Sequence, residues 1–196
     1  MASTEPEPLE VLLYPDPFLR KRIRAVTAEE FLAGKADGWS LAELVERIKA
    51  TLAANQGLGL AATQVGVGLR LFIAHVPKEH EGVLVAFNPV LVEAHGSVVE
   101  EEGCLSLPGV RAKVKRHATL KLNGVGLDGR PFTVEAQALL ARVCQHEADH
   151  LDGVLFTDRL GLAGRLMIRR QLAELEYDYK RLQGKKGRRL PAGVGR

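Results

Sequence analysis

Two histidines four residues apart, His146 and His150, constrain this chain more than any other feature of its sequence. They lie in residues 136–151, whose apolar side chains recur at helical spacing, so the sequence predicts a helix with both imidazoles on one face. Two imidazoles one turn apart can reach a single metal ion. Glu147 can contact a metal-bound water and carry its proton without being a ligand. The alternative interpretation is two ordinary histidines of an amphipathic helix.

A metal site built on two histidines needs a further ligand, because three protein ligands and one water are the usual catalytic arrangement. We prefer Cys104, because the neighbouring Gly103 and Pro108 indicate a backbone shaped to present the thiol. Cys144 lies two residues before His146 and points away from the histidine face, so it is interpreted as a small core residue. The other candidates are His117, Glu174 and Glu176.

The order of the predicted elements indicates an α+β fold, with antiparallel strands packed around the central metal-binding helix and a helix at the C-terminus. Capping boxes at Thr27 with Glu30 and at Ser40 with Glu43 mark two helix starts, and the second helix runs to about Asn55. A glycine-rich loop follows at 57–64, and the last helix covers about 163–182. Strands are expected at 69–76, 83–87, 90–93, 97–100, 119–125 and 132–136.

Length and composition favour one soluble globular domain, since 196 residues with 46% hydrophobic content can bury one sizeable core. We expect a single catalytic domain over residues 1–196, with 1–10 and 184–196 as flexible tails. Apolar runs are too short to cross a bilayer, and the N-terminus lacks the charge order of a signal peptide. The expected location is therefore the cytoplasm, away from membranes, with both cysteines reduced.

Three segments together resemble the signature motifs of peptide deformylases: residues 57–64 (GLGLAATQ), 102–106 (EGCLS) and 145–151 (QHEADHL). Their order and spacing also match, and the similarity extends over nearly the whole chain. The resemblance implies a hydrolase that removes the N-formyl group from the N-terminal methionine of newly made proteins. It implies that Cys104, His146 and His150 hold one metal ion with water as the fourth ligand. The family usually works with Fe(II), for which Zn, Ni or Co could substitute.

The same resemblance implies roles around the metal. Glu147 would be the general acid and base, while the side-chain amide of Gln64 and the backbone N–H of Leu105 would stabilise the oxyanion. Gly59 would pair its backbone with the extended substrate. The remaining substrate contacts would come from a methionine pocket and a residue near the peptide: Leu58, Leu139 and Val143, then Arg111. Ordinary core packing is the alternative for the three apolar residues.

Two features depart from the common pattern of that family. Residues 31–39 look like an enlarged early loop, and Glu100 stands where an apolar residue is usual, at the rim of the pocket. Glu102 is expected to pair with Arg116 behind the metal site.

Two other functions stay open at this stage. A zinc endopeptidase would use Glu174 or Glu176 in place of Cys104, and a ribosome-associated binding module would keep the metal for structure alone. The expected partners are nascent N-formyl-Met polypeptides, with the chain as a monomer. Residues 180–196 contain seven Lys or Arg and no acid, so this end could contact the ribosome or be a solvated tail.

Overall fold

The structure is a computed structural model that describes residues 6–183. A five-stranded antiparallel sheet in the order β3-β4-β5-β8-β9 forms its frame. The strands of this sheet are β3 (Gly59–Ala61), β4 (Leu71–Ala74), β5 (Leu84–His95), β8 (Thr119–Val125) and β9 (Pro131–Gln137). Two antiparallel pairs stand apart from it: β1 (Lys35–Ala36) with β2 (Trp39–Ser40), and β6 (Val98–Cys104) with β7 (Leu107–Arg116).

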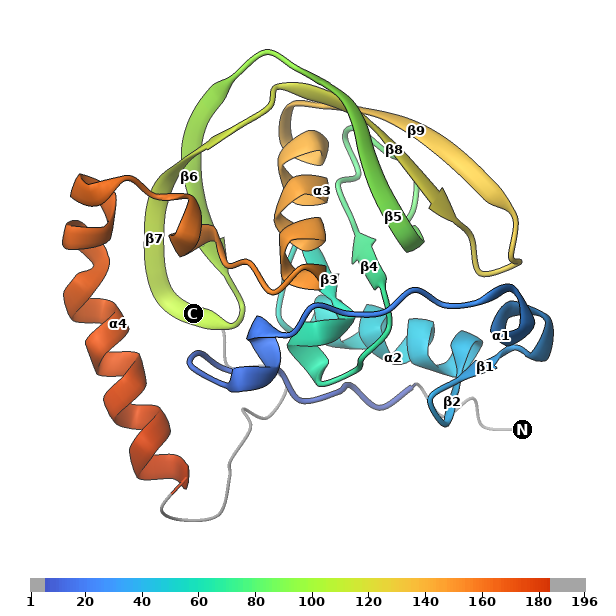
Figure 1. Ribbon diagram of the computed structural model, residues 1–196, viewed down its shortest axis with the longest axis horizontal. Coiled ribbons are helices and arrows are strands. Elements are labelled where there is room, and N and C mark those ends of the chain that lie inside the picture. Colours follow the sequence, from blue (N-terminus) through green and yellow to red (C-terminus); the bar gives the residue numbers. More distant parts are fainter. Residues whose placement is uncertain (1–5, 184–196) are drawn as a thin grey trace.

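Four α-helices surround these strands. They are α1 (Ala28–Ala33), α2 (Leu41–Ala54), α3 (Ala138–Leu151) and α4 (Leu162–Gln183). Three single turns of 3₁₀-helix connect the elements: η1 (Pro17–Arg20), η2 (Ala62–Val65) and η3 (Phe156–Arg159). Figure 1 shows α3 between the β6–β7 hairpin and the main sheet, while α4 lies on the far side of that hairpin.

Strand β4 explains why helices cover both faces of the sheet. All four of its residues are buried, and successive side chains point to opposite faces. Leu71 and Ile73 join the apolar cluster that contains α2, whereas Phe72 and Ala74 join the cluster that contains α3. Because both faces of β4 are apolar, the sheet holds α2 and α3 on opposite sides.

The start of α3 is fixed from outside the helix. Its N-cap residue, Gln137, makes no side-chain cap, and Ala138 has a positive φ of 45°. Glu79, in the connection between β4 and β5, instead accepts hydrogen bonds from the backbone N–H groups of Leu139 (3.2 Å) and Leu140 (2.9 Å). A carboxylate at this end satisfies otherwise unpaired donors and opposes the positive end of the helix dipole.

The predicted α+β class is confirmed, with antiparallel strands around a central helix and a helix at the C-terminal end. The predicted helices at 136–151 and 163–182 correspond to α3 and α4, and the Thr27–Glu30 capping box is present at α1. Ser40 caps α2 by accepting a hydrogen bond from the Glu43 N–H.

Three expectations about local structure were wrong. The stretch 57–64 is not a loop, because Gly59–Ala61 pairs with β4 and η2 follows at once. The strands expected at 83–87 and 90–93 are one strand, β5, whose register shifts between Phe87 and Val90. Residues 31–39 are not an open loop but the end of α1 and a short hairpin. Strand β7 was not anticipated, because its pairing with β6 depends on the hairpin turn at the metal site.

Part of the expected amino-terminal tail is attached to the fold. Residues 1–5 and the expected tail at 184–196 lie outside the described residues. The Leu9 N–H, however, donates a hydrogen bond to Thr51 Oγ1 (2.7 Å), and Arg47 Nε donates one to the Glu7 carbonyl (2.9 Å). Residues 7–9 are therefore held along α2. Across residues 6–183, none of the helices combines the length and the apolar character needed to cross a membrane.

Candidate metal centre and active site

Three side chains from two elements meet beside α3 and could hold a metal ion. Cys104 ends β6, and His146 and His150 lie one turn apart on α3. Their ligand atoms all lie within 4.8 Å of one another, and Cys104 Sγ is 3.3 Å from His150 Nε2. One thiol and two imidazoles form a donor set that suits zinc, iron and related transition metals.

The surroundings of the two imidazoles fit a cation at this position. His146 Nδ1 is 3.0 Å from Glu102 Oε2, which leaves Nε2 for the ligand group, as carboxylate-supported metal-binding histidines require. Burial lowers the pKa of His146, but hydrogen bonds to Cys104 and Glu102 outweigh it and raise that pKa well above the usual range. At His150 burial lowers the pKa well below its usual value, which favours the neutral, ligating imidazole.

Glu147 is buried next to the three ligands. Its Oε2 has no hydrogen-bond partner among the described residues, so one carboxylate oxygen is uncommitted. Burial raises its pKa to about 7, although the charge of His146 acts in the opposite direction. A carboxyl group that titrates near neutrality can both accept and return a proton.

Glycine at position 59 is required by the packing around Glu147. A Cβ atom built there would lie 2.5 Å from Glu147 Oε1 and 2.7 Å from Val143 Cγ1. Only a residue without a side chain allows the β3 backbone to approach the carboxylate this closely.

Gln64 and Leu105 both line the cavity together with Cys104. Gln64 Oε1 accepts a hydrogen bond from the Ala61 N–H (2.9 Å), which fixes the orientation of the amide. Its Nε2 then donates to Ser106 Oγ (3.2 Å) and to Cys104 Sγ (3.4 Å). Leu105 occupies the turn between β6 and β7. The Gln64 amide is thus held beside the thiol, and Leu105 follows Cys104 directly in the chain.

Nearly all the predicted site residues line one cavity of about 660 Å³. His150 does not line it; the others do, namely Leu58, Gly59, Gln64, Cys104, Leu105, Arg111, Leu139, Val143, His146 and Glu147. Leu58 is 44% exposed, so this apolar side chain stands open to the cavity rather than being buried in the core. The Arg111 side chain is largely exposed and lies 3.5 Å from Glu101.

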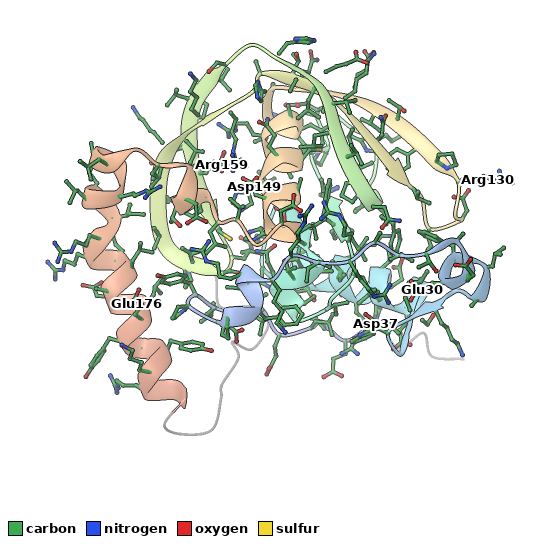
Figure 2. All side chains as sticks on the ribbon, viewed as in Figure 1. Glu30, Asp37, Arg130, Asp149, Arg159 and Glu176 are labelled. Carbon is green, nitrogen blue, oxygen red and sulfur yellow. The ribbon has the colours of Figure 1, made fainter. Side chains whose placement is uncertain are left out.

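Behind the two histidines lies a buried ionic network larger than the sequence predicted. The expected pair is present, since Arg116 donates to both oxygens of Glu102 (2.9 and 3.0 Å). Burial disfavours ionisation of Glu102, but hydrogen bonds from His146 and Arg116 outweigh it and lower its pKa to about 2. The roles of Asp149 and Arg159 were not predicted. Asp149 accepts hydrogen bonds from Arg116 (2.6 Å) and from Arg159 (2.5 Å). Arg159 lies on η3 and reaches α3 from there (Figure 2). The signal available in the sequence was an acidic residue, Asp149, within the helix that was predicted to be central, because a buried acid needs a partner.

The other candidates for the third ligand are engaged elsewhere. Cys144 is fully buried, and burial raises the pKa of its thiol to about 12. His117 Nδ1 lies 3.3 Å from the Gly96 carbonyl. Glu174 accepts a hydrogen bond from Arg170, and Glu176 accepts one from Tyr14. Both acids lie on α4, and Figure 2 shows Glu176 away from α3. Neither acid belongs to the Cys/His/His group found among the described residues.

Fold and site together define a mixed helix and antiparallel-sheet protein with a Cys/His/His group, of which Cys104 and His146 line a cavity. The chain belongs to the polypeptide deformylase family, whose sequence model matches residues 8–165. It is 38% identical over 165 residues to a peptide deformylase of Syntrophobacter fumaroxidans, covering 83% of this chain and 92% of that one. The corresponding protein of Alkalilimnicola ehrlichii is 39% identical over 168 residues, covering 85% and 90%.

Solved structures agree with this assignment. The crystal structure of a peptide deformylase from Legionella pneumophila is similar with a TM-score of 0.76 at 36% identity, covering 91% of this chain and 99% of that one. A plant peptide deformylase gives a TM-score of 0.79 at 31% identity, with 98% of each chain covered. The family acts on N-formylated nascent peptides, and the expectation of an enzyme of this family is confirmed.

Proposed function

We propose that this chain is a metal-dependent hydrolase that removes the N-formyl group from the N-terminal methionine of newly synthesised proteins. Cys104, His146 and His150 hold one metal ion, and Glu147 is the general acid and base. The observation that carries the proposal is the position of the Glu147 carboxyl, which is buried in the cavity beside the three ligand atoms with one oxygen uncommitted.

The residues around the ligands account for the steps of amide hydrolysis. Glu147 accepts a proton from the attacking water as the oxygen of that water bonds to the formyl carbon. Negative charge then develops on the formyl oxygen, where the Gln64 amide and the Leu105 N–H are the stabilising donors. Glu147 returns the proton to the departing amine as the carbon–nitrogen bond breaks, which gives formate and a free N-terminus.

The cavity supports recognition of an extended peptide. Gly59 offers backbone at an edge of β3 that β4 does not occupy, so a substrate can add there as a further strand. Leu58, Leu139 and Val143 receive the methionine side chain, and Arg111 approaches the peptide. An Arg111→Ala protein with unchanged peptide kinetics would remove that last role.

We propose that the site holds one Fe(II) ion per chain, for which Zn, Ni or Co could substitute. When bound, it supplies a Lewis acid that lowers the pKa of a water molecule and polarises the formyl carbonyl. The protein supplies the supporting contacts, because Glu102 orients His146 and Arg116 orients Glu102.

We further infer that the chain acts in the cytoplasm as a monomer and forms one catalytic domain. The basic end of α4 and the residues beyond it could bring the enzyme to the ribosome, where its nascent substrates emerge. Ribosome affinity that does not change with salt, or that survives deletion of residues 184–196, would exclude contact through the tail.

The decisive experiment measures formate release from an N-formyl-Met peptide, with protein purified anaerobically and loaded with Fe(II). We expect rapid release and one ion per chain, and a Glu147→Ala protein that keeps its metal but loses about 10²- to 10⁴-fold in rate. A fully loaded wild-type protein that releases no formate would reject the proposal. Cleavage of unformylated peptides in the same assay would favour the endopeptidase alternative.

A further inference from the structure

Strand β6 and helix α3 contact each other at regular intervals. Cys104 Sγ lies 3.3 Å from His150 Nε2, and Glu102 Oε2 lies 3.0 Å from His146 Nδ1. Two residues along a strand and four residues along a helix both advance by about 6 to 7 Å, so this pairing can repeat. It does repeat once more, between Glu100 and Arg142, with Oε2 and Nη1 separated by 3.7 Å. The first two pairs belong to the metal site, and the third has no role there.

Arg142 lines the same cavity as Leu139, Val143 and His146. Helix geometry requires this, because positions 139, 142, 143 and 146 share one face. Its side chain is 18% exposed, and its Nε is buried without a hydrogen-bond partner among the described residues. A guanidinium carries five N–H donors, and the long contact to Glu100 leaves most of them uncommitted.

Among the described residues, none of the acids that line the cavity forms an ion pair with Arg142. Glu102 is bound by Arg116, and Glu101 pairs with Arg111. Glu100 remains as its partner, and that side chain is 63% exposed. The pocket expected for a methionine side chain therefore has a cationic hydrogen-bond donor, Arg142, in its wall.

We propose that Arg142 is a specificity-determining residue that donates a hydrogen bond to the end of the substrate's first side chain. The inference rests on the proposed function and extends its substrate class to peptides that begin with formyl-methionine sulfoxide. Arg142 lies four residues before His146, a rise of about 6 Å along α3, which matches the reach of an unbranched side chain whose formyl group is at the metal site. A thioether sulfur is a weak acceptor, a sulfoxide oxygen is a strong one, and norleucine offers none.

The test compares three formyl peptides that differ only in the first residue: norleucine, methionine and methionine sulfoxide. Formate release gives kcat/KM for each with the wild-type, Arg142→Leu and Arg142→Lys proteins. We expect the sulfoxide-to-norleucine ratio of kcat/KM to fall at least tenfold in Arg142→Leu, mainly through KM, and to be partly restored in Arg142→Lys. Arg170→Leu removes an equal charge from an exposed site on α4 and should leave the ratio unchanged.

A second variant tests the partner of Arg142. Glu100→Ala should lower the same ratio by a smaller factor, because it releases the guanidinium from its position, and should have no further effect on Arg142→Leu. A ratio that stays within twofold of wild type in Arg142→Leu would overturn the inference. If the wild type releases no formate at all, the proposed function fails, and calorimetric Kd values for the same three peptides decide the inference. A preference for the sulfoxide peptide that is abolished in Arg142→Leu supports the inference. Equal affinities for the three peptides overturn it.

Discussion

Helices α3 and α4 follow one another closely in the chain but differ in which side chains they bury. Ten of the fourteen residues of α3 are buried, including the polar Gln145, His146, Glu147, Asp149 and His150. In α4, over residues 162–181, Ile168 alone is buried, while four large apolar side chains are exposed: Leu162, Leu166, Met167 and Tyr177. One helix buries polar groups and the other exposes apolar ones.

This difference in burial shows that the polar residues of α3 are kept inside the fold at a cost in stability, which their partners must offset. Buried polar groups are tolerated only when they are paired, and α3 obtains its partners from β6, β7, η3 and the connection before β5. Helix α4 needs no such support and is joined to the rest by a small apolar cluster and by polar contacts such as Tyr14 with Glu176. Substitutions matched between the two helices should therefore differ greatly in effect.

Loss of a ligand on the α3 side should have the largest effect. We expect Cys104→Ser to weaken metal binding by more than about 100-fold, because even changes to the groups that support a ligand weaken it by about 10- to 100-fold. Glu176→Gln, on α4, should leave metal content unchanged. Metal analysis after dialysis measures both. A Cys104→Ser protein that retains its metal while Glu176→Gln loses it would reverse the assignment.

Glycine substitutions should give the next largest contrast. The Cβ of Gly59→Ala meets Glu147 and Val143, so the carboxylate must shift and formate release should fall by about 10²-fold or more. At Gly161, immediately before α4, an added Cβ meets nothing within 4 Å. Gly161→Ala should therefore keep full activity. Equal rates for the two variants in the formate assay would contradict the close packing of β3 on α3.

Each helix also takes part in an ion pair: Asp149 of α3 with Arg116 of β7, and Glu174 with Arg170 within α4. Arg116 and Asp149 are buried, with side chains 3% and 10% exposed, whereas Arg170 and Glu174 are 91% and 61% exposed. Arg116→Met leaves Glu102 and Asp149 as buried charges without this partner and should lower the free energy of unfolding by about 3 to 5 kcal/mol. Arg170→Met should change it by less than about 0.5 kcal/mol. Urea denaturation of the two variants measures the difference.

The external cap of α3 should have a moderate effect. Removing the carboxylate in Glu79→Ala leaves the N–H groups of Leu139 and Leu140 without this acceptor and should cost about 1 to 2 kcal/mol of stability. Glu79→Gln keeps an acceptor oxygen but loses the charge, so its loss should be smaller. The free energy of unfolding in urea distinguishes the two. Identical losses would show that charge, rather than acceptance of hydrogen bonds, is what Glu79 supplies.

The smallest effect is expected where α4 is attached. Burial and the hydrogen bond to Glu176 raise the pKa of Tyr14 to about 12, from a usual value of 10.0. The contribution of this contact is therefore fully present below pH 10 and is lost as the pH rises from 10 to about 12. Unfolding experiments across this window should show a loss in the wild type that is reduced in Tyr14→Phe. A Tyr14→Phe protein with the same alkaline loss would locate the titration elsewhere.

Local patterns in the sequence were sufficient to predict the central helix and much of the β-rich middle. Helical spacing of apolar residues predicted 136–151, and α3 spans 138–151. The strand expected at 119–125 coincides with β8, since Thr119–Val125 alternates buried and exposed side chains. Such patterns report on the energies of near neighbours in the chain, so they locate elements with one apolar face. They gave no sign of β7, or that Gly59–Ala61 would pair with β4.

The sequence by itself determined which chemistry this protein can carry, because His146, Glu147 and His150 occupy one short helix at fixed spacing. The sequence offered Cys104 as a candidate third ligand but could not place it beside the histidines, since 46 residues separate it from His150. Only the tertiary structure decided that Asp149 and Arg159 support the site and that Arg142 pairs with Glu100. These contacts join β6 to α3 and α3 to η3, and no local periodicity encodes them. Their energies appear only once packing around α3 has removed water and made each buried polar group depend on a partner.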